Sequence, residues 1–381
     1  MRIAFIGQKG IPTKFGGIER HVEELSRRLV KAGNQVFVYC RPWYTPKNRS
    51  RFQGINLVTL PSIQRKHLDA ISHTLISTLH ALTQDYDIIH YHGVGPALLS
   101  FIPRIFKPKT KVIVTFHCID RKHQKWGWFA RLSLKLGEAA ACYFPHKTIT
   151  VSKTLQYYCS QIFNCDTVYI PNGVSPKGKY DDNLIKQKFA LEKGSYILAV
   201  ARLVRHKGIH YLVQAYQHLH TNKKLVIVGG SAFTDDYVDE LKQLAANSPQ
   251  IIFTGYQEGK MLDQLFNNAF LVVHPSESEG LPLAVLEAMS YGTPVLASDI
   301  AENLEVVKGN GFSFRNKSVS DLERKLKFLL GQPLLVRKIG RQSRGYVMEN
   351  YNWDDIVQKI QVVYDEEMGY KKLVSYSSQQ A

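Results

Sequence analysis

Short runs of β-branched and aliphatic residues alternate along the chain with longer stretches in which apolar residues recur every three to four positions. The short runs are typical of buried strands, and the longer stretches are typical of amphipathic helices that cover a parallel sheet. In the first half we expect strands at 2–6, 35–39, 55–60, 87–90, 111–116, 148–151 and 167–170, and helices at 18–32, 67–83, 126–143 and 153–163.

Turn residues at 171–173 and a more polar stretch interrupt this alternation, which begins again near residue 196. The pattern therefore predicts two Rossmann-like α/β domains, residues 1–171 and residues 172–353, that face each other across a cleft. In the second half we expect strands at 196–200, 224–228, 251–253, 270–274 and 294–297, and helices at 209–220, 236–246, 260–268, 283–291, 319–330, 334–349 and 354–367.

The length fits two domains, since 381 residues exceed what one hydrophobic core usually serves. No apolar stretch is long enough to predict a transmembrane helix, and the opening MRIAFIGQKG lacks the apolar region of a signal peptide. The five cysteines show neither a CxxC pair nor the spacing of a metal site. Such cysteine usage is typical of a reducing cytoplasm, where we expect the protein.

Positive charge is concentrated in the first half of the chain. Residues 1–171 hold 24 of the 49 Lys and Arg residues but only 9 of the 32 Asp and Glu residues. Residues 172–381 hold the other 25 basic and 23 acidic residues. The halves therefore carry +15 and +2, which indicates an anionic partner for the first half. An anionic membrane and a nucleic acid both fit this charge, but the sequence has no recognised nucleic-acid-binding module.

The segment ESEGLPLAVLEAM, residues 277–289, joins a predicted strand to a predicted helix that has Pro282 in its first turn. The free N–H groups of such a loop and first turn can hold an anion or a polyhydroxyl group. Glu279 lies in the loop and Glu287 on the helix, and each carboxylate can accept two hydrogen bonds from neighbouring hydroxyls of a sugar. The alternatives are dipole compensation by Glu279 and a solvated helix face for Glu287.

Arg202 and Lys207 follow the strand expected at 196–200 and precede the helix expected from residue 209. At the carboxyl end of a strand, a forked guanidinium and an ammonium group can clamp a diphosphate. Surface charge in an ordinary strand-to-helix loop is the alternative for this spacing.

Two glycines and two histidines complete the candidate residues. Gly16 and Gly17 follow the first strand and open a helix, where the backbone can approach a phosphate closely. The segment is not GxGxxG and no acid closes the second strand, so a dinucleotide-dependent oxidoreductase is disfavoured. His117 closes its strand and would face the cleft. His92 has a similar placement and is the weaker candidate, and a satisfied core histidine is the alternative.

In this order, these stretches resemble the retaining nucleotide-sugar glycosyltransferases of family four, which have the GT-B fold. The opening, from IGQKGIPTKFGG to VYCR, is also similar to a bacterial subgroup that includes rhamnosyltransferases of surface-polysaccharide assembly. The matching residues are Gly16 and Gly17, His117, Arg202 with Lys207-Gly208, Glu279 with Glu287 as an E-x7-E element, and the framework segments 171–174 and 292–295.

The resemblance implies how the second domain would hold a nucleotide-sugar donor. Arg202 and Lys207 would bind the diphosphate and stabilise the charge that develops on the leaving group. Glu287 would bind the ribose, and Tyr256 would lie against the base. Glu279 would hold hydroxyls of the donor sugar together with the backbone N–H groups of Gly280 and Leu281.

The resemblance also implies roles for the first domain and for the reaction. His117 would contact the donor sugar near the reacting carbon, and Gly16 and Gly17 would let the first loop close on the phosphates. Catalysis would need no metal and no cofactor, and no DxD stands at a predicted strand end. The acceptor hydroxyl would attack from the leaving-group face, so that configuration is retained. The segment 300–305, IAENLE, departs from the family's glycine-rich turn, so its backbone cannot be carried over.

By the same resemblance, the first domain would bind the acceptor, and a helix at about 354–368 would pack back on it. Its charge then fits a saccharide or polyprenyl-diphosphate-linked acceptor and an anionic membrane, which predicts a peripheral position at the inner face of the cell membrane. Residues 121–129 mix cations with aromatic residues, as interfacial segments do, although a solvated helix with core aromatics is the alternative.

These observations favour a glycosyltransferase that builds a bacterial polysaccharide. The same fold also serves non-hydrolysing nucleotide-sugar epimerases, which would consume the donor without an acceptor. A sugar-nucleotide-binding protein without activity is the third hypothesis, and the presence of both cations and both acids argues against it.

Overall fold

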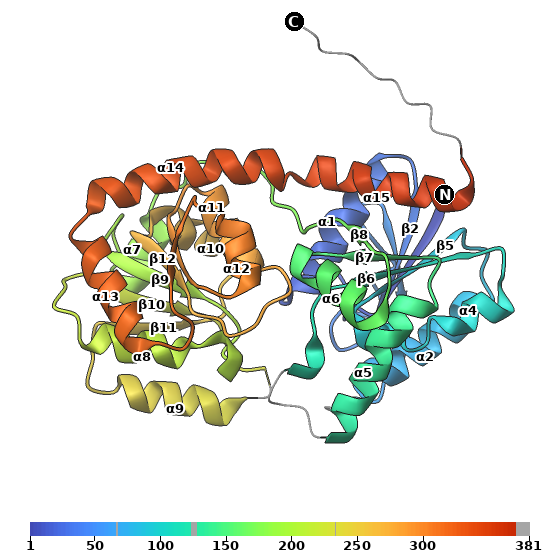
Figure 1. Ribbon diagram of the computed structural model, residues 1–381, viewed down its shortest axis with the longest axis horizontal. Coiled ribbons are helices and arrows are strands. Elements are labelled where there is room, and N and C mark those ends of the chain that lie inside the picture. The colour runs from blue at the N-terminus through green and yellow to red at the C-terminus, as the bar shows by residue number, and fades with distance from the viewer. Residues whose placement is uncertain (66–67, 123–127, 233, 371–381) are drawn as a thin grey trace, which may run out of the picture.

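The structure is a computed structural model that describes residues 1–65, 68–122, 128–232 and 234–370. Two Rossmann-like α/β domains lie side by side, each with its own sheet and with helices on both faces (Figure 1). Their strands are near-continuous runs of buried residues, as expected for parallel sheets that helices cover on both sides.

The first sheet is built from residues 2–169. Its strands run β3-β4-β2-β1-β5-β6-β7-β8, and all pair in parallel except β3, which is antiparallel to β4. Their bounds are β1 (Arg2–Ile6), β2 (Gln35–Cys40), β3 (Arg51–Phe52), β4 (Ile55–Thr59), β5 (Ile88–His92), β6 (Lys111–Phe116), β7 (Lys147–Thr150) and β8 (Val168–Tyr169).

The second sheet has six parallel strands in the order β11-β10-β9-β12-β13-β14. In sequence this is the 3-2-1-4-5-6 order of dinucleotide-binding folds, with a switch in chain direction between β9 and β12. The strands are β9 (Tyr196–Val200), β10 (Lys224–Val228), β11 (Ile251–Gly255), β12 (Leu271–His274), β13 (Val295–Ser298) and β14 (Phe312–Phe314).

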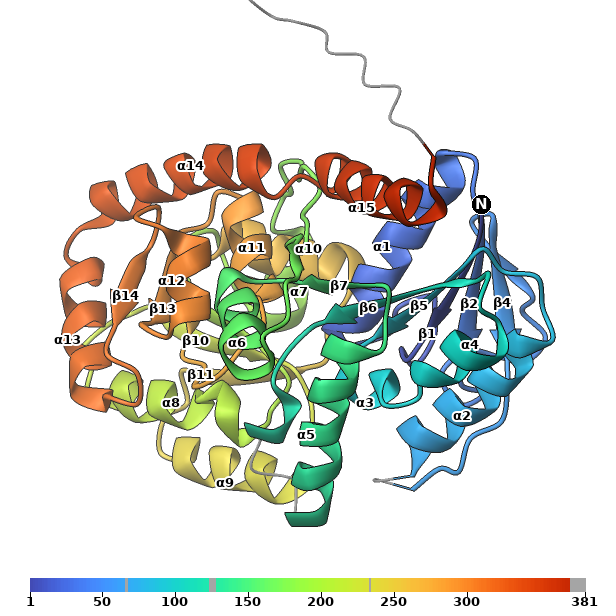
Figure 2. The same ribbon diagram turned by 45° about the vertical axis from the view of Figure 1, so that its right-hand side comes forward.

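The helices of the first domain divide between the two faces of its sheet (Figure 2). One face is covered by α1 and by the last helix of the chain, α15, and the other face by α2 to α6. The bounds are α1 (Gly17–Lys31), α2 (Asp69–Leu82), α3 (Val94–Ala97), α4 (Phe101–Phe106), α5 (Trp128–Tyr143), α6 (Lys153–Phe163) and α15 (Trp353–Met368).

In the second domain, α8, α9 and α13 cover one face of the sheet, and α7, α10 and α11 lie on the other. The bounds are α7 (Asn183–Phe189), α8 (Ile209–Gln217), α9 (Asp235–Ala245), α10 (Gly259–Asn268), α11 (Leu283–Ser290), α12 (Ala301–Val307), α13 (Val319–Leu330) and α14 (Pro333–Asn350). Two 3-10 turns, Asp120–Lys122 and Arg205–Lys207, lie at strand-to-helix connections.

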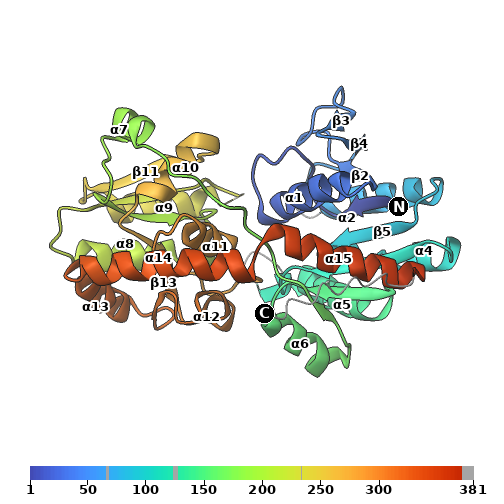
Figure 3. The same ribbon diagram turned by 90° about the horizontal axis from the view of Figure 1, so that it is seen from above.

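Two chain segments cross between the domains side by side. Val174 donates its N–H to the carbonyl of Tyr351 and accepts from Trp353, which joins the first crossing to the return of the chain. On the two sides of this junction, α14 lies along the second domain and α15 along the first, in nearly one line (Figure 3). Apolar residues of α15, among them Ile356 and Ile360, enter the core of the first sheet.

The structure differs from the sequence predictions mainly in short elements. The edge strands β3 and β14 and the helices α3, α4, α7 and α12 were not expected. Each is too short for a hydrophobic period to emerge, and α3 and α4 each contain a proline. The segment 300–305, whose backbone could not be carried over from the family, leads into α12. None of the described helices is both long and apolar enough to span a membrane.

Candidate active site

The carboxyl ends of both parallel sheets lead into one interdomain site. In the first sheet, loops leave β1 on one side of the switch in chain direction and β5 and β6 on the other. In the second sheet, the corresponding loops follow β9 and β12. Ligands of such folds bind at these edges, so residues at these strand ends are the candidates for chemistry.

Lys207 and Glu279 are brought together from two loops of the second domain. The ammonium Nζ of Lys207 lies 2.5 Å from Oε1 of Glu279, and the side chains are only 14% and 9% exposed. His274, the last residue of β12, lies with Nε2 2.7 Å from the same oxygen. Among the described residues Oε2 has no hydrogen-bond partner, so this oxygen can accept from a ligand hydroxyl.

Glu279 is held as a carboxylate despite its burial. Burial alone would raise its pKa, but the charge of Lys207 and the hydrogen bond from His274 outweigh burial and hold the pKa well below its ordinary value. The site therefore has a fixed negative charge beside a fixed positive charge, which differs from dipole compensation at a helix end.

Arg202 lies at the carboxyl end of β9 and is exposed. No ion pair or hydrogen bond of its guanidinium is recorded within the described parts of the chain, so the side chain is available to an anion. Burial raises the pKa of the Cys118 thiol, and the charges of Arg202 and Glu279 also act on it. Cys118 belongs to the facing domain, so the charges of Arg202 and Glu279 both act across the boundary between the domains.

The turn that carries Lys207 ends at Gly208, and its conformation depends on this glycine. This residue has φ of +66°, and a Cβ atom there would lie 2.0 Å from the carbonyl oxygen of Pro275. Only glycine therefore lets the turn that carries Lys207 pack against the loop that carries Glu279.

Glu287 is buried on α11 rather than solvated, with only 9% of the residue exposed. Its Oε1 lies 2.5 Å from the guanidinium of Arg20 on α1, so the pair joins the two domains. Glu287 is the main cause that raises the pKa of Arg20. The solvated-face alternative for Glu287 is therefore wrong, because this acid faces the first domain.

The glycine-rich loop of the first domain and the loop ahead of α11 approach each other closely. A Cβ atom on Gly280 would lie 1.6 Å from the carbonyl oxygen of His117, and one on Gly17 would lie 3.1 Å from Leu283. Leu281 is buried in the same loop. Gly16 has φ of +111° and precedes α1, where the Glu19 carboxylate accepts from the N–H of Lys9.

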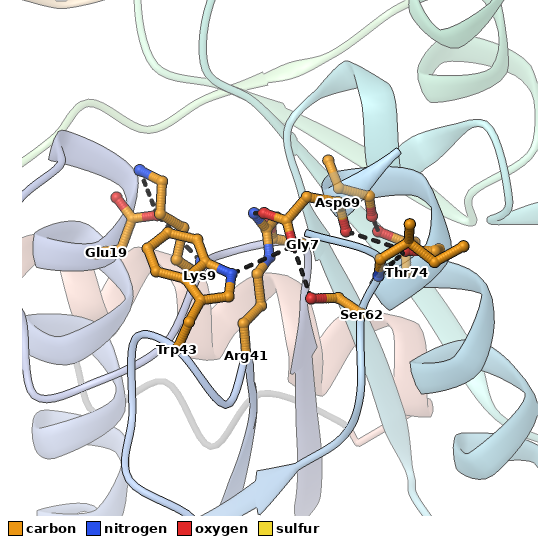
Figure 4. Close-up of polar contacts among 11 residues, drawn as sticks. Gly7, Lys9, Glu19, Arg41, Trp43, Ser62, Asp69 and Thr74 are labelled. Carbon is orange, nitrogen blue, oxygen red and sulfur yellow. Dashed lines mark hydrogen bonds and ion pairs between the residues drawn. The ribbon is translucent and has the colours of Figure 1, made fainter. Parts of the chain in front are cut away.

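Aromatic side chains lie at the edge of the site beside Tyr256, which is 51% exposed after β11. Its ring lies 6.5 Å from Phe15 of the facing domain, and Phe15 stacks on Trp43 at 6.5 Å. Figure 4 shows that Asp69 binds three donors near this point, namely Arg41, the indole N–H of Trp43 and the hydroxyl of Ser62.

Three histidines form a buried cluster in the first domain, and none of them is more than 7% exposed. His21 of α1, His92 of β5 and His117 each offer one ligand atom within 4.8 Å of the others, so they have the composition of a transition-metal site. Burial is the main cause that lowers the pKa of all three, to about 4 for His21. The cluster is therefore neutral.

Two family models match consecutive parts of the chain. Residues 15–177 match the model described as Glycosyltransferase Family 4, and residues 181–345 match the model described as Glycosyl transferases group 1. The chain is a glycosyltransferase. The boundary between the matches coincides with the segment that crosses between the domains, so each domain corresponds to one model.

Similar proteins share this architecture over their full length. The glycosyltransferase is 28% identical to an uncharacterized glycosyltransferase of Methanocaldococcus jannaschii, over 96% of this chain and 98% of that one. The sucrose-phosphate synthase of Thermosynechococcus elongatus superposes with a TM-score of 0.84 at 21% identity, over 97% and 100% of the chains. HepE of Anabaena in complex with UDP-glucose superposes with a TM-score of 0.81 at 20% sequence identity, over 96% of this chain and 100% of that one. The fold is GT-B.

Sequence reasoning assigned no role to several residues of this site. His274 could have been found, because it is polar and ends a buried strand. Arg20 gave no signal, since its partner lies in the other domain and only the tertiary structure joins them. His21 lies on the buried face of an amphipathic helix, where a polar residue is unusual, and its Nδ1 bonds to Asn172 at 2.8 Å.

Proposed function

We propose that this glycosyltransferase moves a sugar from a nucleotide-sugar donor to a saccharide acceptor with retention of configuration and without a metal ion. The observation that carries the proposal is the position of Lys207 against Glu279 at the carboxyl edge of the second sheet, with Arg202 exposed in the same connection between β9 and α8 as Lys207. Two cations here can neutralise a diphosphate, which elsewhere is the task of a divalent ion.

Each part of a donor then has a group of suitable chemistry. Arg202 and Lys207 would bind the diphosphate and stabilise the charge that grows on the departing phosphate oxygen. The free Oε2 of Glu279 and the N–H groups at Gly280 and Leu281 suit hydroxyls of the sugar. Glu287 would take the ribose hydroxyls, for which it must exchange or share its contact with Arg20.

The reaction itself replaces one bond to the anomeric carbon by another on the same face. The bond between this carbon and the phosphate oxygen breaks, and the nucleoside diphosphate leaves with the electron pair. The acceptor oxygen bonds to the carbon from the same side, and its proton passes to the departing phosphate oxygen. This route requires no separate base, whereas it requires cations that stabilise the leaving group.

For the physiological role we propose bacterial polysaccharide synthesis on a lipid-linked acceptor, at the cytoplasmic side of the membrane. The resemblance of the first 41 residues to a polysaccharide-assembly subgroup supports this role and makes rhamnose the first donor sugar to test. The HepE structure binds UDP-glucose with the same fold, which supports a nucleoside diphosphate as the leaving group.

A surface of the first domain supports membrane association. Helices α2, α4 and α5 lie on one side of the sheet (Figure 2), and several of their exposed residues are large and apolar. We name this surface the apolar–basic face; its exposed apolar residues are Leu75, Leu79, Ile105, Phe106, Trp128, Leu132 and Leu136, and its exposed cations are Arg104, Lys109, Arg131 and Lys135.

The acids of these three helices do not face solvent. Asp69 of α2 is paired with Arg41, and Glu138 of α5 is fully buried against Arg121. Helix α4 contains no acid. Exposed apolar side chains and cations on helices that carry no solvent-facing acid suit an anionic bilayer, which stabilises each Lys or Arg at its surface by about 1 kcal/mol. The segment 121–129, expected to contact the membrane, lies mostly outside the described residues.

Transfer from radiolabelled nucleotide-sugars to the lipid fraction of a membrane extract tests the proposal. Label that moves into lipid-linked saccharide in the presence of EDTA supports it. Isomerised free donor would instead support the epimerase hypothesis. Unchanged donor across a full panel of sugars and bases would contradict transfer.

A further inference from the structure

Within the buried histidine cluster, the ring of His92 contacts the ring of His117. Nδ1 of His92 lies 3.1 Å from Nε2 of His117. The ring of His92 also stacks on His90 at 4.4 Å, and His90 bonds to Tyr364 of α15 and to Thr115. His90 is therefore held by two hydrogen bonds, and its stacked ring restrains the ring of His92.

One proton must occupy the contact between His92 and His117. A neutral imidazole carries one N–H and one lone pair, so one ring has to donate and the other has to accept. Both rings are neutral because burial lowers both pKa values well below the ordinary value for histidine. Two tautomer arrangements are consistent with the 3.1 Å separation.

The second nitrogen of His92 decides between these arrangements. Nε2 of His92 is fully buried and has no hydrogen-bond partner among the described residues. If His92 accepted from His117, its own proton would sit on this nitrogen as a buried donor without an acceptor, which folded proteins rarely tolerate. If His92 donates, the same nitrogen carries only a lone pair.

We propose that His92 is a positioning residue that donates its Nδ1–H to His117 and thereby holds His117 as the neutral tautomer protonated on Nδ1. The second nitrogen of His117, away from His92, is then a hydrogen-bond donor of fixed orientation. The tautomer itself does not depend on the proposed function. Its consequence rests on that function: a donor sugar bound in the cleft would meet an N–H of His117 rather than a lone pair.

The geometry of the surroundings fits a donor aimed at a ligand. His117 is 7% exposed, against 1% for His92, and its carbonyl lies against Gly280 of the sugar-binding loop. Within the described residues no hydrogen bond of its Nδ1 is recorded, so the proposed N–H is free for a ligand. A group held in one tautomer needs no rearrangement when the ligand arrives.

The tautomer can be read directly from the imidazole ¹⁵N resonances of the full chain labelled in histidine. A His117→Gln variant identifies the His117 signals by their loss. We expect a protonated-type shift for Nδ1 and an unprotonated-type shift for Nε2. The reverse assignment would overturn the proposal, and so would a stoichiometric metal ion in the purified chain, because Nε2 would then be a ligand.

A pair of substitutions at His92 separates positioning from packing. Asn can place an amide N–H where Nδ1 of His92 stands, whereas Leu has similar volume and no donor. With the best donor found, we expect His92→Leu to lower kcat by about 10-fold to 100-fold with a smaller change in donor KM, as for the loss of one oriented donor. His92→Asn should recover most of this loss and keep the His117 tautomer.

Equal loss of kcat in the Asn and Leu variants, with unchanged His117 shifts in both, would overturn the proposal. The ¹⁵N measurement does not depend on turnover. A chain that shows the expected tautomer but transfers no sugar would therefore contradict the proposed function and leave the proton arrangement standing.

Discussion

Lys207 and Glu279 form an ion pair of 2.5 Å between the turn after β9 and the loop ahead of α11. Both side chains are shielded from solvent, and His274 bonds to the same carboxylate oxygen. The pair keeps two opposite charges stable at a sheet edge where a charged ligand is expected. It also means that either charge is costly when left alone.

Lys207→Met should destabilise the chain and stop transfer. Removal of one partner of a buried pair costs about 3–5 kcal/mol, because the other charge stays buried without compensation. The double variant Lys207→Met/Glu279→Gln should regain most of the unfolding free energy in urea titrations, yet remain inactive. A double variant as unstable as Lys207→Met would contradict the ion-pair account, and an active one would contradict the site assignment.

Glu287→Gln should weaken donor binding more than it weakens the fold. Hydrogen bonds to a charged group contribute about 1.5–3 kcal/mol, which corresponds to an increase in donor KM of about 10-fold to 100-fold. Glu349→Gln, an exposed acid on α14, is the control and should leave donor KM unchanged. A donor KM for Glu287→Gln equal to that of the control would remove the ribose role.

Gly280→Ala should prevent the close approach of the two domains without unfolding either. The added Cβ atom would lie 1.6 Å from the carbonyl of His117, so the loops must separate. We expect a larger radius of gyration in solution scattering and loss of transfer. Gly345→Ala on α14 has open space around its Cβ position and serves as the control. Wild-type scattering and turnover in Gly280→Ala would show that this approach is not needed.

The buried histidines should make stability depend on pH. The pKa of His21 is lowered by burial from 6.5 to about 4, so below pH 6.5 the unfolded chain binds a proton that the folded chain excludes. The contribution of His21 to the free energy of unfolding is therefore fully present above pH 6.5 and is lost as the pH falls toward 4. The loss is at most about 1.4 kcal/mol per pH unit for each such histidine.

Urea unfolding between about pH 7 and pH 5 checks this slope. His21→Gln should reduce the slope, whereas His220→Gln, at an exposed position, should not. Equal slopes for the two variants would contradict the buried, neutral state of His21.

Replacement of exposed leucines by acids on the apolar–basic face should weaken binding to anionic vesicles. We expect Leu132→Glu/Leu136→Glu to lose most of the binding that the full chain shows to phosphatidylglycerol vesicles at low salt. Leu334→Glu on α14 of the second domain is the control, because this leucine is even more exposed than Leu132 and Leu136. Similar loss in both variants would contradict a specific membrane face.

Much of the fold could be predicted because the sheets are parallel and buried on both sides. Strands such as β1, β6, β9 and β10 are short, mainly apolar runs rich in Val and Ile between turn signals, and their predicted bounds agree with the structure. The edge strands β3 and β14 lie where pairing partners, rather than local residues, define the strand. Such elements have little pattern of their own.

The candidate site could be predicted as far as its residues follow strand ends. Lys207, Glu279 and His117 could be predicted as candidates because they lie at or after the carboxyl ends of buried strands, and the structure places all three at the interdomain edges. Partners that meet only across domains, such as Arg20 with Glu287, leave no periodicity in the sequence. The same holds for the bond between His92 and His117, which depends on the register of β5 and β6.

The central claim is that two cations of the second domain hold a diphosphate without a metal ion. Calorimetric titration of nucleoside diphosphates and monophosphates in EDTA tests it most directly, with the wild type and Arg202→Ala. The account predicts that a diphosphate binds in EDTA and that Arg202→Ala weakens it by about 10-fold or more, with little change for the monophosphate. Binding that needs a divalent ion, or equal diphosphate affinity in both proteins, would contradict it.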